Sequence, residues 1–543
     1  MTNNDGTLKF NPMDYPYGSR RSVIYAKRGM VCTAQPLAAQ AGLRILQAGG
    51  NAIDAAIATA ICLTVVEPTS NGLGSDAFAL VWVKNKLYGL NGSGYSPKAF
   101  TPENLASRGI KDTIPDRGFV PVMVPGAPSA WAELHKRFGR LPFAQLFEPA
   151  IEYAAEGYPV SPVVAGFWLN GLELFTKFKD KPEFEGWFST FAPRGETPKA
   201  GQTVRLPDHA KTLELLAASG CESFYRGEVA KAISKFSKAT GGLLNKEDLE
   251  EYKAQWVDPI HINYHGYDVW EIPPNGQGIV ALMALNMLKG FAFTDKESVD
   301  TYHKQIEAMK MAFADGKAYV ADSRHMHTKV KDMLSEDYAA KRRGTIGDKA
   351  VEPQADKPYS GGTVYLCTAD GEGNMVSFIQ SNYKGFGSGV VVPGYGIAFN
   401  DRGCDFSLDP QSDNYAQPRK KPYHTIIPGF LTKAGKAVGP FGVMGAYMQP
   451  QGHVQVIMNT VNFGLNPQAA LDAPRWQWIK DKTIYVEKSV NTEIVKGLIA
   501  KGHDVKVVDD VSGFGRGEII WRDKDGVLCG ATEPRADGTV ASW

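Results

Sequence analysis

The sequence has few cysteines and no long hydrophobic run. Only six of its 543 residues are cysteine, and none of them forms a Cys-x-x-Cys pair. This excludes a disulfide-stapled domain, and cysteines scattered through apolar segments are typical of a reduced, cytoplasmic protein. The longest apolar run, Ala55–Val66, is far too short to cross a bilayer. The opening residues have no apolar segment of the kind found in secretory signals, so we expect a cytoplasmic location.

Neither sign of charge dominates the sequence. Lysine and arginine total 59 and aspartate and glutamate total 58, which gives a net charge of +1 at pH 7. No run of like charge exceeds a few residues, so we expect no general electrostatic binding to nucleic acid or to an acidic membrane. Hydrophobic residues make up 43% of the chain, which is an ordinary globular composition with enough apolar material for a large core.

Hydrophobic periodicity predicts a mixed α/β protein. Helical patterns cover Leu37–Gln47 and Ala52–Val66, with Pro36 and Asn51 at their starts, and also most of residues 125–250, Ser298–Ala321, 452–464 and 467–472. Strand patterns cover Phe78–Val83, Lys86–Leu90, Val364–Ala369, Met375–Ser381, Ile426–Leu431 and Val438–Val443. Helices thus predominate in the first two thirds and strands after residue 360, an order that favours a layered α/β architecture.

The junction at Gly362 and Thr363 is the sharpest local feature. The segment Gly347–Tyr359 has two prolines and no apolar periodicity, which predicts an exposed loop, and a buried strand begins just after Thr363. On the residues alone, a plain loop-to-strand junction is the commoner explanation. The alternative is a self-cleaving precursor. Cleavage of the Gly362–Thr363 bond would free an α-amine with a pKa of about 7.7–8.0, which could act as the base that a threonine nucleophile needs.

Other motifs give weaker indications. The glycine-rich run Gly385–Gly389 resembles a dinucleotide loop, but no helical pattern follows it, so we reject a nucleotide site. Two histidine pairs, His325/His327 and His261/His265, have spacings that a metal could use, yet no third ligand is evident and we expect no metal site. The run Gly442–Ala446 could present N–H groups to an oxyanion or form a plain turn.

Two further patterns are read in their simplest sense. A Ser-His-Asp hydrolase is not favoured, because the sequence has no Gly-x-Ser-x-Gly elbow. The run Arg419–Lys421 predicts a solvated basic patch.

Several segments together resemble the γ-glutamyltransferase family of N-terminal nucleophile hydrolases, in order and spacing, through most of the chain. They are Gly49–Ala56, Val124–Gly126, Trp131–Pro142, Glu307–Lys310, Ala312–Asp315, Thr363–Ser407 and Gly530–Arg535. The resemblance implies a four-layer αββα sandwich made as one precursor, with a large subunit of residues 1–362 and a small catalytic subunit of residues 363–543. It implies no cofactor and no metal, and it leaves a homodimer open.

The resemblance also implies roles for individual residues. Thr363 would be the nucleophile, forming an acyl-threonine intermediate with its own amine as base, and Ser381 would position it. The backbone N–H groups of Gly445 and Ala446 would hold the oxyanion. The implied substrate-binding residues are Asp405, for an α-amino group, and His424 and Thr425, which replace two serines that contact the substrate carboxylate.

Departures from the family pattern bear on the substrate. The family arginine that binds the α-carboxylate of a γ-glutamyl group would lie near Ser93, and no arginine is there. Tyr383 replaces the usual asparagine, Arg402 stands where a glutamine is often found, and Ala446 adds a methyl group beside the implied oxyanion hole. A bidentate arginine–carboxylate pair is a strong, directional contact, so its absence shifts the expectation away from plain γ-glutamyl recognition unless Arg402 or another cation replaces it.

Three functions remain open from the sequence. The first is cleavage of γ-glutamyl amides such as glutathione, with transfer to water or to an amine acceptor such as an amino acid. The second is cleavage of another small carboxylated amide, as in cephalosporin acylase-like and oxamate amidohydrolase-like members of the family. The third is an unprocessed, non-catalytic relative. The missing arginine leads us to expect that small or non-glutamyl carboxylated amides are preferred over glutathione.

Overall fold

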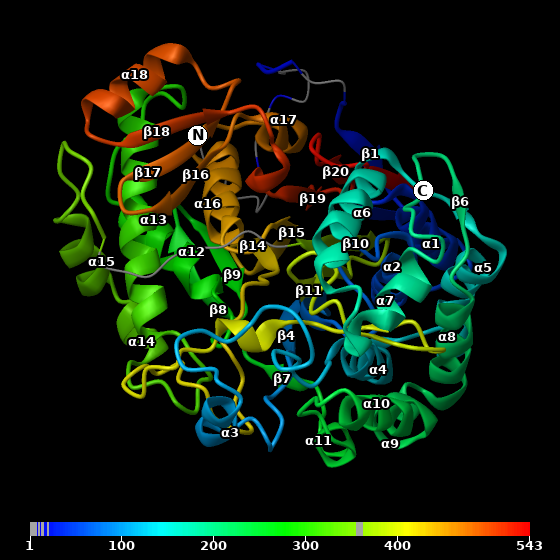
Figure 1. Cartoon of the computed structure of the whole chain (residues 1–543). Coiled ribbons are helices and arrows are strands. Elements are labelled where there is room, and N and C mark those ends of the chain that lie inside the picture. Colours follow the sequence, from blue (N-terminus) through cyan, green and yellow to red (C-terminus); the bar gives the residue numbers. More distant parts are fainter. Residues whose placement is uncertain (1–7, 9–10, 12–15, 19–20, 354–361) are drawn as a thin grey trace.

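Four layers stack in the order helix, sheet, sheet, helix in a computed structural model of the protein (Figure 1). The structure describes residues 8, 11, 16–18, 21–353 and 362–543. Two seven-stranded sheets lie face to face in the middle, and neighbouring strands in each sheet run antiparallel. This is the αββα sandwich of the N-terminal nucleophile hydrolases, as the resemblance implied.

Sheet I contains the strand that begins at Gly362. Its strands, in spatial order, are β21 (Thr539–Ser542), β2 (Gly29–Thr33), β10 (Gly362–Asp370), β11 (Met375–Tyr383), β3 (Asp76–Val83), β4 (Lys86–Gly92) and β7 (Gln255–Val257). Sheet II contains, in order, β1 (Ile24–Ala26), β20 (Leu528–Thr532), β19 (Arg516–Arg522), β15 (Lys436–Met444), β14 (Gly429–Lys433), β9 (Tyr267–Glu271) and β8 (Ile260–Tyr264). Both sheets therefore contain strands from before and from after residue 362.

Side-chain alternation along the strands divides the core into layers. In β10, Val364 and Leu366 pack with the helices outside sheet I, whereas Tyr365 and Cys367 face sheet II. Tyr365 and Cys367 share the layer between the sheets with residues such as Ile520 of β19. Because residues two apart in a strand lie on the same face, Thr363 also points between the sheets.

Helices cover the outer face of each sheet (Figure 1). Outside sheet I lie α1 (Pro36–Gln47), α2 (Ala52–Val66), α4 (Ala127–Phe138), α5 (Glu148–Glu156) and α8 (Pro207–Ser219). Outside sheet II lie α12 (Gly278–Leu288), α13 (Val299–Tyr319), α16 (Met448–Val461) and α18 (Thr492–Ala500). The other long or site-related elements are α6 (Pro162–Phe175), α7 (Glu185–Phe191), α10 (Glu228–Ala239), α17 (Pro467–Asp472) and a small sheet of β16 (Trp476–Lys480), β17 (Thr483–Glu487) and β18 (Asp504–Val508).

Local chemistry explains why the predicted helices α1 and α2 form where they do. Pro36 occupies the first turn of α1, where its missing N–H costs nothing. Asn51 caps α2, accepting bonds from the N–H groups of Ile53 and Asp54 while the Asp54 carboxylate accepts from the Asn51 N–H. Both helices end at the predicted residues.

One prediction about the elements needs correction. The predicted strand Ile426–Leu431 begins only at Gly429, because the Ile427 N–H donates instead to the side chain of Gln449. Helices predominate in the first two thirds of the chain, as predicted, and strands beyond the two predicted there join both sheets. Part of the predicted loop Gly347–Tyr359 falls outside the described residues, and its described part, up to residue 353, contains no helix or strand.

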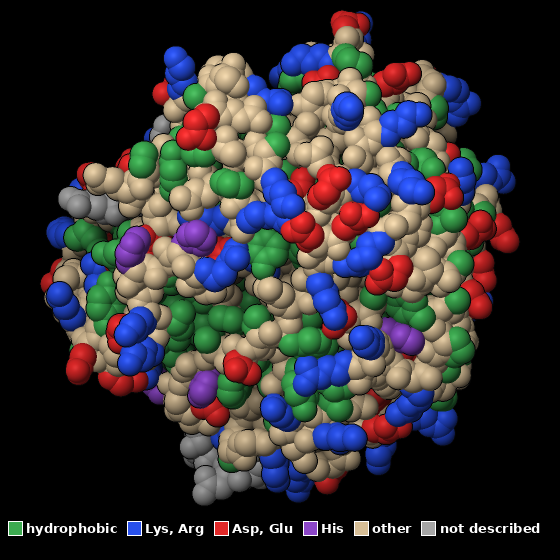
Figure 2. All heavy atoms as spheres, turned by 90° about the horizontal axis from the view of Figure 1, so that it is seen from below, with side chains coloured by type: hydrophobic (Ala, Val, Ile, Leu, Met, Phe, Trp, Pro, Cys, Tyr) green, Lys and Arg blue, Asp and Glu red, His purple; other side chains and the backbone are tan. Residues whose placement is uncertain are grey.

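None of the helices within the described ranges is long and apolar enough to cross a membrane. On the face seen from below, basic and acidic side chains are interspersed, without a continuous patch of one sign (Figure 2). That distribution agrees with the charge balance of the sequence.

Candidate active site

A bulge at the start of β10 places Thr363. Gly362 pairs with Tyr383 and Val364 pairs with Gln380, so Thr363 faces two residues of β11 instead of one. Bulges of this kind re-aim a side chain at the edge of a ladder. Thr363 is fully buried, and its Oγ1 lies 3.0 Å from the Oγ of Ser381 on β11.

A fully buried arginine adjoins this pair of hydroxyls. Arg402 Nη2 donates to Ser381 Oγ at 2.9 Å, and Nη1 donates to Thr425 Oγ1 at 2.6 Å. Its Nε has no hydrogen-bond partner among the described residues and lies 3.8 Å from Asp76 Oδ2. The guanidinium also lies over the ring of Tyr383, 4.4 Å from the ring centre. Only the Ser381 hydroxyl therefore separates the Arg402 cation from Thr363, and the guanidinium keeps N–H groups that could bind a ligand.

Asp405 presents an incompletely paired carboxylate. Tyr383 donates its hydroxyl to Asp405 Oδ1 at 2.8 Å, while Oδ2 is buried and has no partner within the described part of the chain. Burial raises the pKa of Asp405, and the nearby charges of Arg402 and Lys317 counteract this. The Arg402 guanidinium bonds to Ser381 and Thr425 rather than to Asp405.

His424 is held by Asp76 on β3. His424 Nε2 lies 3.0 Å from Asp76 Oδ2, and the Ile426 N–H approaches Nδ1 at 3.4 Å. Burial, with the charges of Arg402 and Lys421, lowers the pKa of His424 far below its usual value. A neutral ring with its proton on Nε2 satisfies both contacts. The role that the resemblance gave His424 in binding a carboxylate stays a prediction, and here the ring instead orients Asp76 beside Arg402.

The turn between β15 and α16 contains Gly445 and Ala446. Their φ angles are +138° and +51°, and the N–H groups of both residues make no hydrogen bond within the described residues. Gln277 fixes this turn, because its side-chain amide donates to both the Ala446 and the Thr425 carbonyls. The predicted oxyanion turn and the Arg402–Thr425 contact are thus joined through one glutamine.

A lysine lies beside the loop where the family arginine is missing. Lys421 Nζ donates to Asn91 Oδ1 at 3.0 Å, and the same oxygen accepts from Ser93 Oγ at 2.7 Å. This corrects the expectation of a solvated patch at Arg419–Lys421, since Lys420 and Lys421 are only 2% and 4% exposed. Burial lowers the pKa of Lys421 to about 8.

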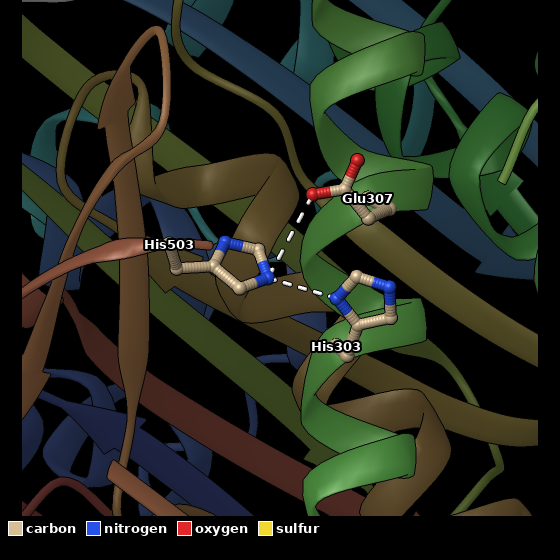
Figure 3. Close-up of side chains that lie close together, drawn as sticks. All are labelled: His303, Glu307 and His503. Atoms are coloured by element: carbon tan, nitrogen blue, oxygen red, sulfur yellow. Dashed lines mark hydrogen bonds and ion pairs between the residues drawn. The ribbon is translucent and has the colours of Figure 1, made fainter. Parts of the chain in front are cut away.

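One cluster among the described residues has the geometry to hold a metal ion, and it lies on the helices outside sheet II (Figure 3). His303 and Glu307 project from α13 toward His503, and His303 Nδ1 lies 2.8 Å from His503 Nε2. The Lys310 ammonium sits in the same cluster, 2.7 Å from Glu307 Oε1 and 3.5 Å from His503 Nδ1. The positive charge of Lys310 opposes the binding of a metal ion beside it.

The hydrogen bonds of that cluster are already complete with neutral histidines. Lys310 donates to His503 Nδ1, His503 Nε2 donates to His303 Nδ1, and His303 Nε2 donates to the Gly347 carbonyl. Burial lowers the pKa of His303 and lowers that of His503 to about 3, in keeping with neutral rings. Glu307 Oε2 accepts the Val351 N–H. The cluster therefore holds residues 347–351 in place by hydrogen bonds, shortly before the predicted cleavage point between Gly362 and Thr363.

The remaining sequence motifs have structural explanations. The run Gly385–Gly389 follows β11 and leads to a short strand, β12 (Val391–Val392), rather than to a helix. His327 pairs with the Asp413 carboxylate, and His261 stacks on Trp270 with ring centres 4.0 Å apart. All six cysteines are free, and five of them are buried.

The structure brings the predicted site residues into one hydrogen-bonded neighbourhood, and their individual roles stay predictions. It adds three residues that the sequence analysis missed: Asp76, Gln277 and Lys421. For the cluster of His303, Glu307 and His503, the only indication in the sequence is the spacing of His303 and Glu307, which places both side chains on the same face of one helix.

Comparisons with known proteins agree with this geometry. The family model described as gamma-glutamyltranspeptidase matches residues 38–543. The chain is 35% identical to the glutathione hydrolase-like YwrD proenzyme of Bacillus subtilis, covering 96% of this chain and 99% of that protein. It is 33% identical to the oxamate amidohydrolase proenzyme of Klebsiella pneumoniae, covering 95% and 98%.

Solved structures show the same relationship. The crystal structure of cephalosporin acylase from Bacillus halodurans superposes with a TM-score of 0.95 and 59% sequence identity, covering 99% of both chains. These relatives are enzymes by name, and two are named as proenzymes. The chain therefore belongs to the γ-glutamyltranspeptidase family, whose named members include hydrolases and transpeptidases made as proenzymes.

Proposed function

We propose that the protein is a threonine amidohydrolase that cleaves amides whose small acyl group carries a carboxylate. The observation that carries this proposal is the buried guanidinium of Arg402, which is two hydrogen bonds away from Thr363 Oγ1 and whose Nε–H has no hydrogen-bond partner among the described residues. A buried cation with spare donors is a strong binding site for a carboxylate.

The precursor would cleave itself between Gly362 and Thr363 into subunits of residues 1–362 and 363–543. The freed α-amine of Thr363 would then accept the hydroxyl proton as Oγ1 attacks the amide carbon. The N–H groups of Gly445 and Ala446 would stabilise the oxyanion. The C–N bond breaks as the α-ammonium returns the proton to the leaving amine, and water hydrolyses the acyl-threonine ester, unless another amine takes the acyl group first.

A second candidate, cleavage of γ-glutamyl amides such as glutathione, is favoured by Asp405. A γ-glutamyl group carries an α-ammonium, and the unpartnered Oδ2 of Asp405 could accept its hydrogen bonds. The relative named as glutathione hydrolase-like supports this candidate, and the relatives named as oxamate amidohydrolase and cephalosporin acylase support the first.

The test is kcat/KM on four matched substrates: γ-glutamyl, glutaryl and butyryl anilides, and oxamate. We expect the glutaryl anilide to exceed the uncharged butyryl anilide by about 30-fold or more, since a lost buried charge contact costs roughly 2–5 kcal/mol. Arg402→Gln should reduce this ratio toward one, and Arg402→Lys should preserve part of it. The ratio separates recognition from the positioning of Ser381, which would affect both substrates alike.

Asp405→Asn distinguishes the two candidates. If the γ-glutamyl anilide exceeds the glutaryl anilide at least tenfold, and Asp405→Asn removes that advantage, the second candidate holds. A single uncut chain with no activity on any of the four compounds would instead identify a non-catalytic relative.

A further inference from the structure

A cavity of about 650 Å³ adjoins the predicted oxyanion turn. Met444 and Gly445 form part of its wall, and α6 and the β16–β18 sheet form the opposite sides. None of the predicted acyl-binding residues, Asp405, Arg402, Tyr383, His424 and Thr425, lines it. The cavity and the predicted acyl-binding residues therefore lie on different sides of the turn that contains Gly445 and Ala446.

Arg516 projects into this cavity from the first position of β19. Its register partner on β15 is Met444, the residue just before Gly445. Arg516 shares a strand face with Ile520, which packs between the two sheets, so its side chain lies in the layer into which Thr363 also points. Only 7% of Arg516 is exposed, and its Nε has no hydrogen-bond partner among the described residues.

The groups around Arg516 balance its positive charge only in part. Its Nη1 lies 3.4 Å from Glu67 Oε1, which is long for a hydrogen bond, and its guanidinium stacks on the Phe167 ring at 4.3 Å. A second arginine, Arg117, also lines the cavity, and its buried Nε has no partner in the described structure. The carboxylate of Asp510 lies at the exposed rim.

The rest of the wall is largely apolar. Its aliphatic and aromatic members include Leu174 of α6, Ile479 and Val508 of the β16–β18 sheet, Phe514 before β19 and Phe386 after β11. Apolar walls with a few convergent polar groups are typical of small-molecule sites, and a volume of this size suits a ligand the size of an amino acid or a short peptide.

We propose that this cavity is the leaving-group site, and that Arg516 binds a carboxylate on an amine with an apolar body, such as an apolar amino acid or an aromatic amino acid analogue. This rests on the proposed function. When the amide C–N bond breaks, the amine takes the proton held by the Thr363 α-ammonium and remains against Gly445. In transfer, an amine of the same class enters here and its nitrogen bonds to the acyl carbon as the acyl C–Oγ1 bond of Thr363 breaks; the proton that the amine loses passes through the Thr363 α-amine to Oγ1.

The test uses two leaving groups with the same ring, one charged and one neutral: 4-aminobenzoate and its methyl ester, joined to the same acyl group. Because the ester also changes the leaving ability of the amine, each ratio is compared with that of the wild type. We expect the carboxylated compound to have the higher kcat/KM, by about tenfold or more. Arg516→Gln should lower that ratio to near one, and Arg516→Lys should retain part of it. Glu67→Gln, which removes the opposing carboxylate, should raise the ratio. Arg44→Gln, in an exposed ion pair on α1, is the matched control and should leave the ratio unchanged.

Calorimetric binding of free 4-aminobenzoate separates this proposal from the proposed function. Binding that depends on Arg516, in a protein that cleaves none of the amides, would support the site and overturn the proposed function. Amide cleavage with a charge ratio that Arg516→Gln and Glu67→Gln both leave unchanged would overturn the site and keep the function. If Arg516→Gln does not fold, the opposite shift expected from Glu67→Gln still decides the matter.

Discussion

Arg402 donates a 2.9 Å hydrogen bond to Ser381 Oγ, the hydroxyl that lies 3.0 Å from Thr363 Oγ1. The Tyr383 N–H donates to the same Ser381 oxygen at 2.7 Å. With two N–H groups pointing at its oxygen, Ser381 keeps its own proton free to be donated, and in its contact with Thr363 Oγ1 either hydroxyl can be the donor. A donated hydrogen bond stabilises negative charge that develops on Thr363 Oγ1 as the nucleophile loses its proton. Arg402 thus strengthens that effect through Ser381.

Removing the Ser381 hydroxyl should therefore slow the chemistry more than it weakens binding. We expect Ser381→Ala to lower kcat by about 10- to 1,000-fold, the range found when a preorganised donor is lost, with a small change in KM. Steady-state kinetics on the best anilide of the substrate panel provide the measurement. Ser381→Thr keeps a hydroxyl and should retain most of the rate, so equal losses in both variants would contradict the donor role.

Self-processing should depend on Thr363. Cleavage before Thr363 should give fragments of about 39 and 20 kDa, in proportion to their lengths. Thr363→Ala should leave one intact chain on a denaturing gel and in a mass spectrum. Thr363→Ser keeps the nucleophilic oxygen and should still be cut, though its side chain is less restricted in rotation. Efficient cleavage of Thr363→Ala would rule out this nucleophile.

The sequence predicted local structure well where short-range chemistry decides it. Asn51 and its capping partner Asp54 begin α2 within three residues of one another, so the start of that helix was visible in the sequence. The start of β14 was not visible, because the Ile427 N–H is used by Gln449, 22 residues away. A hydrophobic run shows that a segment is buried, but it does not show which group pairs with its backbone.

In the candidate active site, too, contacts between residues close in sequence could be predicted and contacts between distant residues could not. The resemblance identified Thr363 and Ser381, which lie on one hairpin, and the structure brings them together. Asp76 was not identified, because its contact with His424 joins residues 348 positions apart. The sequence predicts a solvated Lys421 side chain, because no local pattern shows that Asn91 accepts a hydrogen bond from its ammonium group. Such pairings are properties of the folded layers rather than of any segment.

The charge of Glu67 should be visible in the pH dependence of stability. Burial raises the pKa of Glu67 to about 7, although Arg516 offsets part of the effect. Between pH 4.5 and 7 the folded state then holds a proton that the unfolded state has lost, so Glu67 makes the unfolding free energy fall as pH rises. Relative to the wild type, Glu67→Gln should gain on the order of 3 kcal/mol between pH 4.5 and pH 7 and stay level above that.

Denaturant unfolding at several pH values measures this difference. Glu250→Gln, in an exposed ion pair with Lys246, is the matched control. Glu250 lies on the surface, so we expect no comparable change with pH. A constant difference for Glu67→Gln across pH 4.5–7 would show that Glu67 is ionised throughout.

The cluster that fastens residues 347–351 should depend on Lys310 rather than on a metal. Lys310→Met leaves the Glu307 carboxylate buried without its ion pair, which should cost about 3–5 kcal/mol of unfolding free energy. Adding Glu307→Gln removes the uncompensated charge and should recover much of that loss.

The positive charge of Lys310 also opposes metal binding at this cluster, because its ammonium bonds to the Glu307 carboxylate and lies 3.5 Å from His503 Nδ1. Without its ammonium, His303, Glu307 and His503 present the two imidazoles and one carboxylate that zinc accepts. Zinc should therefore raise the melting temperature of Lys310→Met and leave that of the wild type unchanged. The double variant with Glu307→Gln should respond less, because a neutral amide is a poorer zinc ligand than a carboxylate. A fall in the wild-type melting temperature on adding a chelator would show instead that the native cluster holds a metal.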